Sequence, residues 1–499
     1  MEYLNQILAR LTEDEKLEFA HLIHTDKGDT LEEQLYKELC GESSDPKAEL
    51  YKTENDDAYH SVRKRLLRKI SDHFGAKKIA SDKEGFAVAL RAIYFAEMMI
   101  QRNAPDVARN FLRKAEEWST ENQRFLMLDA VYDVQLTYFA FLRLDPELIR
   151  TNMEKNLNNL KIARRLNSEY TNVVVEIEKG KKKGVTVNPK ELLQQVFSQK
   201  ELIEPGLNSA DFMYKLVLLV RTFALTTKNY FDFYPYAVKV YEDLKSRKAF
   251  FGGAFGIELH FIYVIAQAAY RLWKIDETRY WLDKMESSLP KDHKEAHPLY
   301  SRYVLMRSAL NTITGRAAEA VEIVSNTLEQ HARHLPPVDI LSLQINLSVN
   351  YFCLQEYKKA NSLLVRLNHT DRWLDDNIGL EARFKLRLIE LVYQVQLERP
   401  DIAETRLRSI KNTFEEYLEK PTFKHGVQFM NIVEFIIKSH EKVRTKEFLE
   451  KMESSSSVLE ETMDDIQAIT FFCWPLAKAK GKDYYEVLLD VVKERERRG

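Results

Sequence analysis

Apolar residues recur along most of the chain at the three- and four-residue intervals of an α-helix. Between residues 56 and 74 one helical face carries Tyr59, Val62, Leu66, Ile70 and Phe74. The segments Thr12–Glu15 and Ser81–Glu84 have the spacing of capping boxes, which predicts that helices begin there. The pattern as a whole predicts an all-α protein of long helices joined by short turns.

Small residues return at a regular interval from about residue 210 onward. The series is Ala237, Thr278, Ala320, Ala360, Ala403 and Thr445, with steps of 41, 42, 40, 43 and 42 residues. Further small residues are separated by 12 and then 7 positions, as in Ala96, Ala108 and Ala115. Two antiparallel helices pack closely only where no large side chain stands at their crossing. The series therefore predicts stacked helical hairpins with a period of about 42 residues.

The separations of 12 and 7 residues resemble the tetratricopeptide repeat (TPR), whose helix-turn-helix unit has small residues at equivalent positions. The resemblance covers about residues 210–460 and is visible again at 88–120. The period exceeds the roughly 34 residues of the standard unit, and armadillo and HEAT repeats share a length of about 40 residues. An irregular helical bundle is the alternative. The resemblance implies a right-handed α-solenoid whose concave surface binds peptides or partner helices.

Changes in the pattern divide the chain into four parts. Residues 1–78 form a small helical domain, and residues 79–210 hold irregular hairpins with one TPR-like unit. The repeat array occupies residues 211–457, and residues 458–499 form a capping helix pair whose charged end faces water. At residues 172–187, β-branched runs flank a Gly/Lys turn. This segment fits a helix followed by a basic loop or a β-hairpin, and we favour the helix.

Composition narrows the class of protein. The 499 residues include only 15 glycines and 13 prolines, too few for the frequent turns of a β-sandwich. The net charge of −2 gives no sign of general nucleic-acid or membrane binding. Cys40, Cys353 and Cys473 are far apart, which indicates a reducing compartment without disulfides. No signal peptide or membrane-spanning run is present, so we expect a cytoplasmic protein.

No motif for catalysis, a cofactor or a metal stands out. Phosphate-binding and nucleophile-elbow motifs are missing, and Phe251–Gly256 is typical of a turn between helices. Three histidine pairs have helical spacing but lack further ligands: His21 and His24, His293 and His297, and His331 and His334. We therefore expect no enzyme activity, no cofactor and no metal site.

An aromatic cluster at residues 230–236 is the candidate site for a protein or peptide partner. It contains Tyr230, Phe233, Tyr234 and Tyr236. One interpretation is packing between adjacent hairpins. The other is an aromatic part of a binding groove, since tyrosine is frequent at binding hot spots.

A basic helix supports a second hypothesis, a nucleic-acid-associated regulator. Its candidate contacts are Arg63, Lys64, Arg65, Arg68 and Lys69. A short N-terminal helical domain before repeats resembles the layout of peptide-responsive bacterial regulators. However, about 15 residues separate the second and third helices, which is too long for a helix-turn-helix motif. The alternative is a solvated face that pairs with the acidic segment 54–57. We therefore place a non-catalytic scaffold first and the regulator second.

Overall fold

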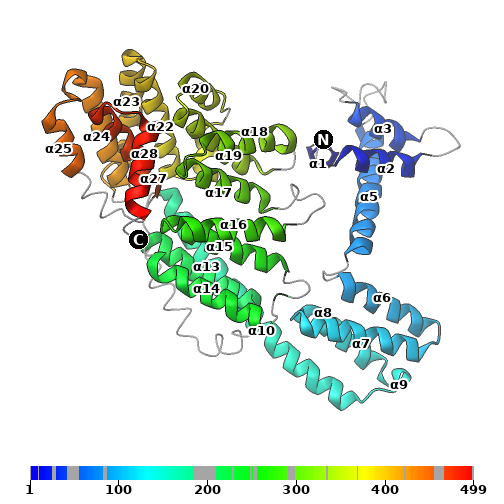
Figure 1. The fold of residues 1–499 in the computed structure, drawn as a ribbon. Coiled ribbons are helices and arrows are strands. Elements are labelled where there is room, and N and C mark those ends of the chain that lie inside the picture. Colours follow the sequence, from blue (N-terminus) through cyan, green and yellow to red (C-terminus); the bar gives the residue numbers. More distant parts are fainter. Residues whose placement is uncertain are drawn as a thin grey trace. The chain divides into compact units, whose positions relative to one another are not determined.

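The computed structural model divides the chain into two compact units, residues 1–157 and residues 158–499 (Figure 1). It describes residues 2–8, 11–24, 30–41, 56–82, 87–183, 210–227, 230–247, 250, 255–289, 298–332, 335–367, 369–420, 423–454 and 466–496. Every regular element within these ranges is helical, which confirms the predicted all-α class.

The first unit contains eight helices in its described residues and the beginning of a ninth. They are α1 (Glu2–Leu8), α2 (Glu13–Ile23), α3 (Leu31–Cys40), α5 (Asp56–Ser81), α6 (Ala87–Gln101), α7 (Pro105–Glu121), α8 (Phe125–Thr137), α9 (Phe139–Leu142) and α10 (Pro146–Lys183). Helix α10 continues into the second unit, where Val173 packs with Leu219. Its course confirms the favoured helix, but the basic run 179–183, predicted as a loop, belongs to that helix. Residues 184–187 lie outside the described ranges.

The helix starts in the N-terminal part follow from their capping residues. Thr12 forms a complete capping box with Glu15: the Thr12 hydroxyl accepts from the Glu15 amide over 3.2 Å, and the Glu15 carboxylate accepts from the Thr12 amide over 2.9 Å. The second predicted capping box is wrong, because Ser81 is the last residue of α5 and does not precede a helix. Helix α5 thus runs past both Phe74 and the predicted domain boundary at residue 78.

The second unit consists of consecutive helices joined mainly by short turns. Its described elements after α10 are α13 (Ala210–Thr227), α14 (Tyr230–Ser246), α15 (Phe255–Arg271), α16 (Ile275–Ser288), α17 (Tyr300–Ile313), α18 (Ala317–His331), α19 (Pro337–Cys353), α20 (Tyr357–Val365), α21 (Asp371–Asn377), α22 (Leu380–Gln396), α23 (Pro400–Phe414), η4 (Glu415–Tyr417), α24 (Lys424–Lys438), η6 (His440–Lys442), α25 (Lys446–Ser454), α27 (Ile466–Lys480) and α28 (Tyr484–Glu496).

One turn conformation, found also at Gln123, Arg143 and Gly481, joins the two helices of five hairpins that carry a buried small residue. Each turn has one residue with a left-handed backbone: Asn103, Trp273, Gly315, Gln355 and Glu398, with φ of 57°, 59°, 85°, 61° and 55°. In every case the following amide donates to a carbonyl five residues earlier, for example Glu356 N to Tyr351 O over 2.9 Å. This bond is the Schellman closure of a helix end, so all five first helices end in the same way.

The predicted small residues lie at equivalent places after these turns. Ala108, Thr278, Ala320, Ala360 and Ala403 are each five residues beyond the left-handed residue, and all are fully buried. The last member of the predicted series is wrong. Thr445 is exposed and stands immediately before α25, where its hydroxyl accepts a hydrogen bond from the Phe448 amide. It therefore caps the helix and does not pack at a helix crossing. Ala237 is buried but lies farther along its helix than the others do.

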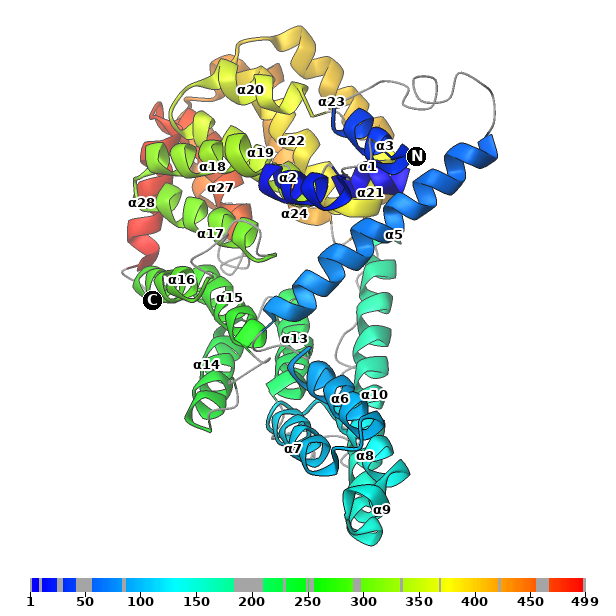
Figure 2. The same ribbon diagram turned by 90° about the vertical axis from the view of Figure 1, so that its right-hand side faces the viewer.

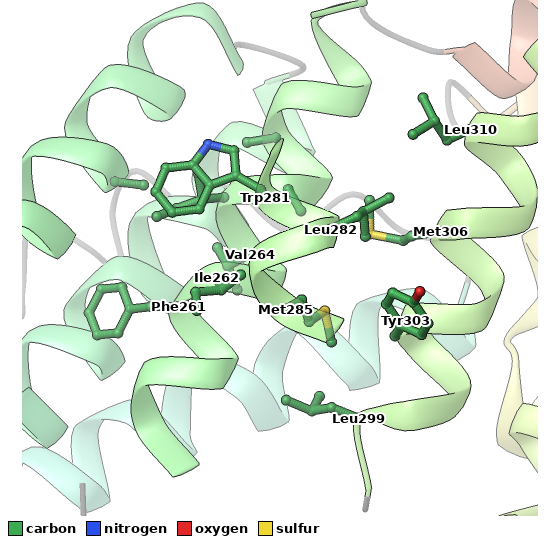
Figure 3. Close-up of a cluster of buried hydrophobic side chains, with 14 of the residues drawn as sticks. Phe261, Ile262, Val264, Trp281, Leu282, Met285, Leu299, Tyr303, Met306 and Leu310 are labelled. Carbon is green, nitrogen blue, oxygen red and sulfur yellow. The ribbon is translucent and has the colours of Figure 1, made fainter. Parts of the chain in front are cut away.

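Neighbouring hairpins are held together by apolar contacts and by a buried polar row. In Figure 3, Leu282 and Met285 of α16 lie beside Tyr303 and Met306 of α17, within one hydrophobic cluster. Between α17 and α19 the hydrogen bonds join residues exactly 38 positions apart: Ser301 to Asp339 over 2.5 Å, Ser308 to Asn346 over 2.6 Å and Thr312 to Asn350 over 2.6 Å. Because a buried polar group needs its partner, this row fixes the register of the two helices.

The C-terminal helix pair, α27 and α28, does more than close the last hairpin. It contacts α24 and α25 and also reaches back along the unit, where it lies in red against the green and yellow hairpins (Figure 2). The Tyr485 hydroxyl donates to Thr312 O over 2.7 Å and accepts from Ala317 N over 3.2 Å. Tyr484 packs on Phe352, and Trp474 donates to Gln396 over 3.2 Å.

The guanidinium of Arg495 completes this series, since it lies 5.6 Å from the ring of Trp273. The contacts of the pair therefore fall at or next to the turns of four successive hairpins. The charged end of α28, predicted to face water, thus also packs on an aromatic side chain of α15–α16.

Candidate functional site

The first helices of the central hairpins are covered by the protein itself. Five consecutive residues of α22, from Glu390 to Gln394, are buried, and so are Asn311, Thr312 and Ile313 of α17. Successive residues of a helix point in all directions, so such runs mean that the helix is packed on every side. A binding groove along these stretches would therefore already be filled by neighbouring helices of the chain.

The aromatic cluster of residues 230–236 is divided between core and surface. Tyr230 and Phe233 are buried in the largest hydrophobic cluster and are not available to a partner. Tyr234 and Tyr236 are half-buried. The Tyr234 hydroxyl accepts from Trp281 Nε1 over 3.4 Å, which ties α14 to α16. Packing between hairpins is therefore what most of this cluster does in the structure.

One aromatic residue in this segment is far more exposed than the four candidate residues predicted from the sequence. Phe231 shows 77% of its surface to solvent, between the buried Tyr230 and the exposed Asp232. Little in the sequence signals this difference, because Tyr230, Phe231 and Phe233 are all aromatic residues within the first turn of α14. Phe231 is the side chain in this cluster that could contact a partner without rearrangement.

Four of the five predicted basic residues of α5, Lys64, Arg65, Arg68 and Lys69, are exposed on one side of the helix, whereas Arg63 is half-buried. Arg65 donates to Glu32 of α3 over 2.6 Å, and the charge of Lys69 also acts on Glu32. Lys64 and Arg68, four residues apart, are exposed, and no ion pair involves them within the described part of the chain. The predicted pairing partner, the acidic segment 54–57, begins in residues outside the described ranges. Lys64 and Arg68 are thus available for a phosphate contact.

Histidine-based metal sites gain no support. His293, His297 and His334 lie outside the described residues. His24 pairs with Glu33 over 2.8 Å instead of joining His21 in a ligand set. In the described ranges, no group of three or more histidine, cysteine, aspartate or glutamate side chains could hold a metal ion. Over the same ranges, no helix has both the length and the apolar character needed to cross a bilayer.

A charged pocket between α21, α22 and α23 was not predicted. It has a volume of ≈ 170 Å³ and is lined by Asp371, Arg387, Glu390, Arg406, Ser409, Ile410, Thr413 and Phe414. The Glu390 side chain is 8% exposed and accepts hydrogen bonds from two arginines: Arg387 over 2.7 Å and Arg406 over 2.5 Å. A carboxylate buried to this degree needs such partners, because burying an unpaired charge is costly.

The acidic groups of the pocket are linked into a wider network. Arg387 also donates to Asp371 over 2.6 Å, and Arg383 bonds both Asp371 over 2.9 Å and Asp375 over 2.6 Å. Burial by itself acts to lower the pKa of Arg387, but the charges of Glu390 and Asp371 outweigh it and raise the pKa. Three arginines therefore balance three carboxylates.

The network lies on a polar stripe of an otherwise apolar helix. Arg383, Arg387, Glu390 and Gln394 are spaced by four, three and four residues along α22. This stripe was the available sequence signal, since polar residues at helical spacing share one face. The contribution of Arg406 and Asp371 from other helices could be seen only in three dimensions.

Comparison of the sequence with protein-family models and with curated proteins gave no match.

Proposed function

We propose that this chain is a non-catalytic scaffold that binds a protein or peptide partner and is built as a TPR-like α-solenoid. One observation carries the proposal: the same left-handed turn and the same buried small residue recur in five hairpins. Repeated hairpins of this kind cannot bury their apolar faces alone and stack on their neighbours. Such stacks present long surfaces, which are suited to extended peptides and partner helices.

The exposed parts of the second helices are the better candidates for the contact surface. The first helices α17 and α22 are packed on all sides near their C-terminal ends, whereas the second helices expose side chains such as Phe231 on α14 and Ile402 on α23. The charged pocket also opens between α22 and α23. The surface we propose therefore runs over the second helices and the pocket, instead of a continuous inner groove.

The test begins with chemical crosslinking of the full chain in a lysate of its source organism, followed by mass spectrometry. The partner found is then purified, and its affinity is measured by calorimetry for the wild type and for Phe231→Ser and Arg406→Gln. Arg408→Gln, an exposed neighbour on α23, is the matched control. Weaker binding by either of the first two variants, with the control unchanged, supports the proposal. A partner that binds all four proteins equally contradicts this surface.

The alternative function, a nucleic-acid-associated regulator, is favoured by one observation: Lys64 and Arg68 are exposed on α5 and free of ion pairs within the described residues. Binding to duplex DNA should be measured at low and moderate salt for the wild type and for Lys64→Ala/Arg68→Ala. Each lost phosphate contact should reduce the salt dependence of the affinity. The control is Lys161→Ala/Arg164→Ala on α10, which removes the same charge elsewhere. Equal binding by both double variants would exclude a specific role for α5.

A further inference from the structure

The charged pocket has an imbalance between hydrogen-bond donors and acceptors. Both oxygens of Glu390 and both oxygens of Asp371 already accept from a guanidinium group. Arg406 uses only Nη1, and no partner for its Nε or Nη2 is found in the part of the chain that the structure describes. The groups left over in this pocket are therefore mainly donors, and a ligand that completes it must supply acceptors.

The spare donors lie together on one helix face. Ser409 and Thr413 follow Arg406 by three and seven residues on α23, so their exposed hydroxyls are on the side of the helix that carries the guanidinium. The Arg406 side chain is 34% exposed, which leaves its free edge accessible from solvent. A hydroxyl can donate to an anion as well as accept, so all three side chains suit one oxygen-rich group.

The surroundings hold the guanidinium in place before a ligand arrives. The buried Glu390 fixes one side of Arg406, while Ile410 and Phe414 supply an apolar wall. The Phe414 ring itself is held against Arg383, whose guanidinium carbon lies 4.7 Å from the ring centroid. A guanidinium that is already ordered loses less conformational freedom when it binds, and its planar fork matches an oxyanion.

We propose that this pocket binds an oxyanion, a carboxylate or a phosphate monoester, with Arg406 as the principal donor and Ser409 and Thr413 as supporting donors. The inference deepens the proposed function and rests on it in one respect only. In a scaffold, the oxyanion is a side chain or terminus of the bound peptide, and the pocket anchors that peptide. Binding of the anion itself does not require that any partner exists.

The test uses the full chain and two free anions, inorganic phosphate and acetate, titrated at constant ionic strength with chloride. The readout is the arginine Nε–Hε NMR signal, assigned to Arg406 by its loss in Arg406→Gln. We expect a saturable shift of this signal with at least one anion. Calorimetry measures the affinity for the anion. Arg406→Gln should weaken this affinity by about tenfold or more, because a charge-assisted hydrogen bond is lost. The matched control Arg408→Gln should bind like the wild type.

Arg406→Gln also removes one partner of the buried Glu390, so a second variant keeps the network intact. Ser409→Ala/Thr413→Val leaves every ion pair in place and should weaken the same anion by about threefold or more, while the thermal unfolding curve stays that of the wild type. Arg406→Lys should bind with an intermediate affinity, since it keeps the charge but loses the fork.

The two anions distinguish the sources of the oxyanion. Saturation by phosphate alone indicates a phosphorylated side chain, and saturation by acetate alone indicates a carboxylate. Either result supports the site, and saturation by both supports it for oxyanions in general. No saturable shift with either anion, or equal weakening in Arg408→Gln, overturns the proposal. If the anion binds but no protein partner is ever found, the scaffold function fails and the site remains.

Discussion

The Ser348 hydroxyl of α19 donates a hydrogen bond to the backbone carbonyl of Ala360 in α20 over 2.9 Å. The two residues are 12 positions apart and belong to one hairpin. Their contact is close because neither side chain is large, and both residues are fully buried. The Tyr393 hydroxyl, 3.0 Å from Ser348 Oγ, links this hairpin to α22.

Ala360→Leu should therefore overpack the crossing of α19 and α20. We expect the free energy of unfolding to fall by about 1–3 kcal/mol, measured as a lower urea midpoint. Lys358→Leu, at an exposed position of the same helix, should change the free energy of unfolding by no more than about 0.5 kcal/mol. A wild-type midpoint for Ala360→Leu would mean that the hairpin crossing is not closely packed.

The left-handed turns predict opposite effects of glycine at two equivalent positions. Gln355 and Gly315 have φ of 61° and 85°, and residues other than glycine are strained there. Gln355→Gly should stabilise the protein by up to about 1 kcal/mol, and Gly315→Ala should destabilise it by about 1 kcal/mol. Differential scanning calorimetry of the two variants checks this. If both lower the melting temperature equally, the turn conformation is not the cause.

Gly426 of α24 marks another close approach of two helices. A Cβ atom at this position would lie 2.5 Å from Cε1 of Phe384, a ring that is itself buried. Gly426→Ala should lower the free energy of unfolding by about 1–3 kcal/mol, although alanine is the better helix former. Gly256→Ala is the control, since its Cβ atom would meet nothing within 4 Å. Urea denaturation should show a lower midpoint only for Gly426→Ala.

The three cysteines should differ in reactivity. Burial raises the pKa of the Cys353 thiol and raises that of Cys473 to about 12, and both side chains are buried. Cys40 is only partly buried, although burial raises its pKa as well. Since the thiolate is the reactive form, N-ethylmaleimide at pH 8 should label Cys40 first in the native protein. Peptide mass spectrometry should find the other two labelled only after denaturation. Rapid native labelling of Cys473 would contradict its burial.

The N-terminal helices should lose stability in acid. Hydrogen bonding by His24, aided by Lys37 and opposed by burial, lowers the pKa of Glu33 from its ordinary value of 4.5 to about 2. A lowered folded-state pKa means that these bonds stabilise the fold fully above pH 4.5 and are lost as the pH falls towards 2. Hydrogen exchange of α3 peptides should thus differ between wild type and Glu33→Gln at neutral pH and converge near pH 2. A constant difference would show that ionisation of Glu33 plays no part.

The parts of this molecule that depend on local rules could be predicted from the sequence, and those that depend on distant pairs could not. The interval between Ala320, Ala360 and Ala403 is a consequence of hairpin geometry, so it can be counted directly in the sequence. Thr445 continues the interval but precedes its helix, because a count of residues does not reveal where a helix begins. The pairing of Glu390 with Arg406 depends on how α22 and α23 pack, for which spacing along one helix gives no information.

The contacts of α27 and α28 have a consequence for how the second unit is made. An array whose hairpins contact only their neighbours can fold from one end as the chain leaves the ribosome. Here Tyr485 bonds residues more than 160 positions earlier, and Arg495 lies on Trp273. Part of the surface of the early hairpins therefore stays exposed until the final helix has been synthesised. Completion of this unit is a late and non-local event, of the kind that slows folding and extends the need for chaperones.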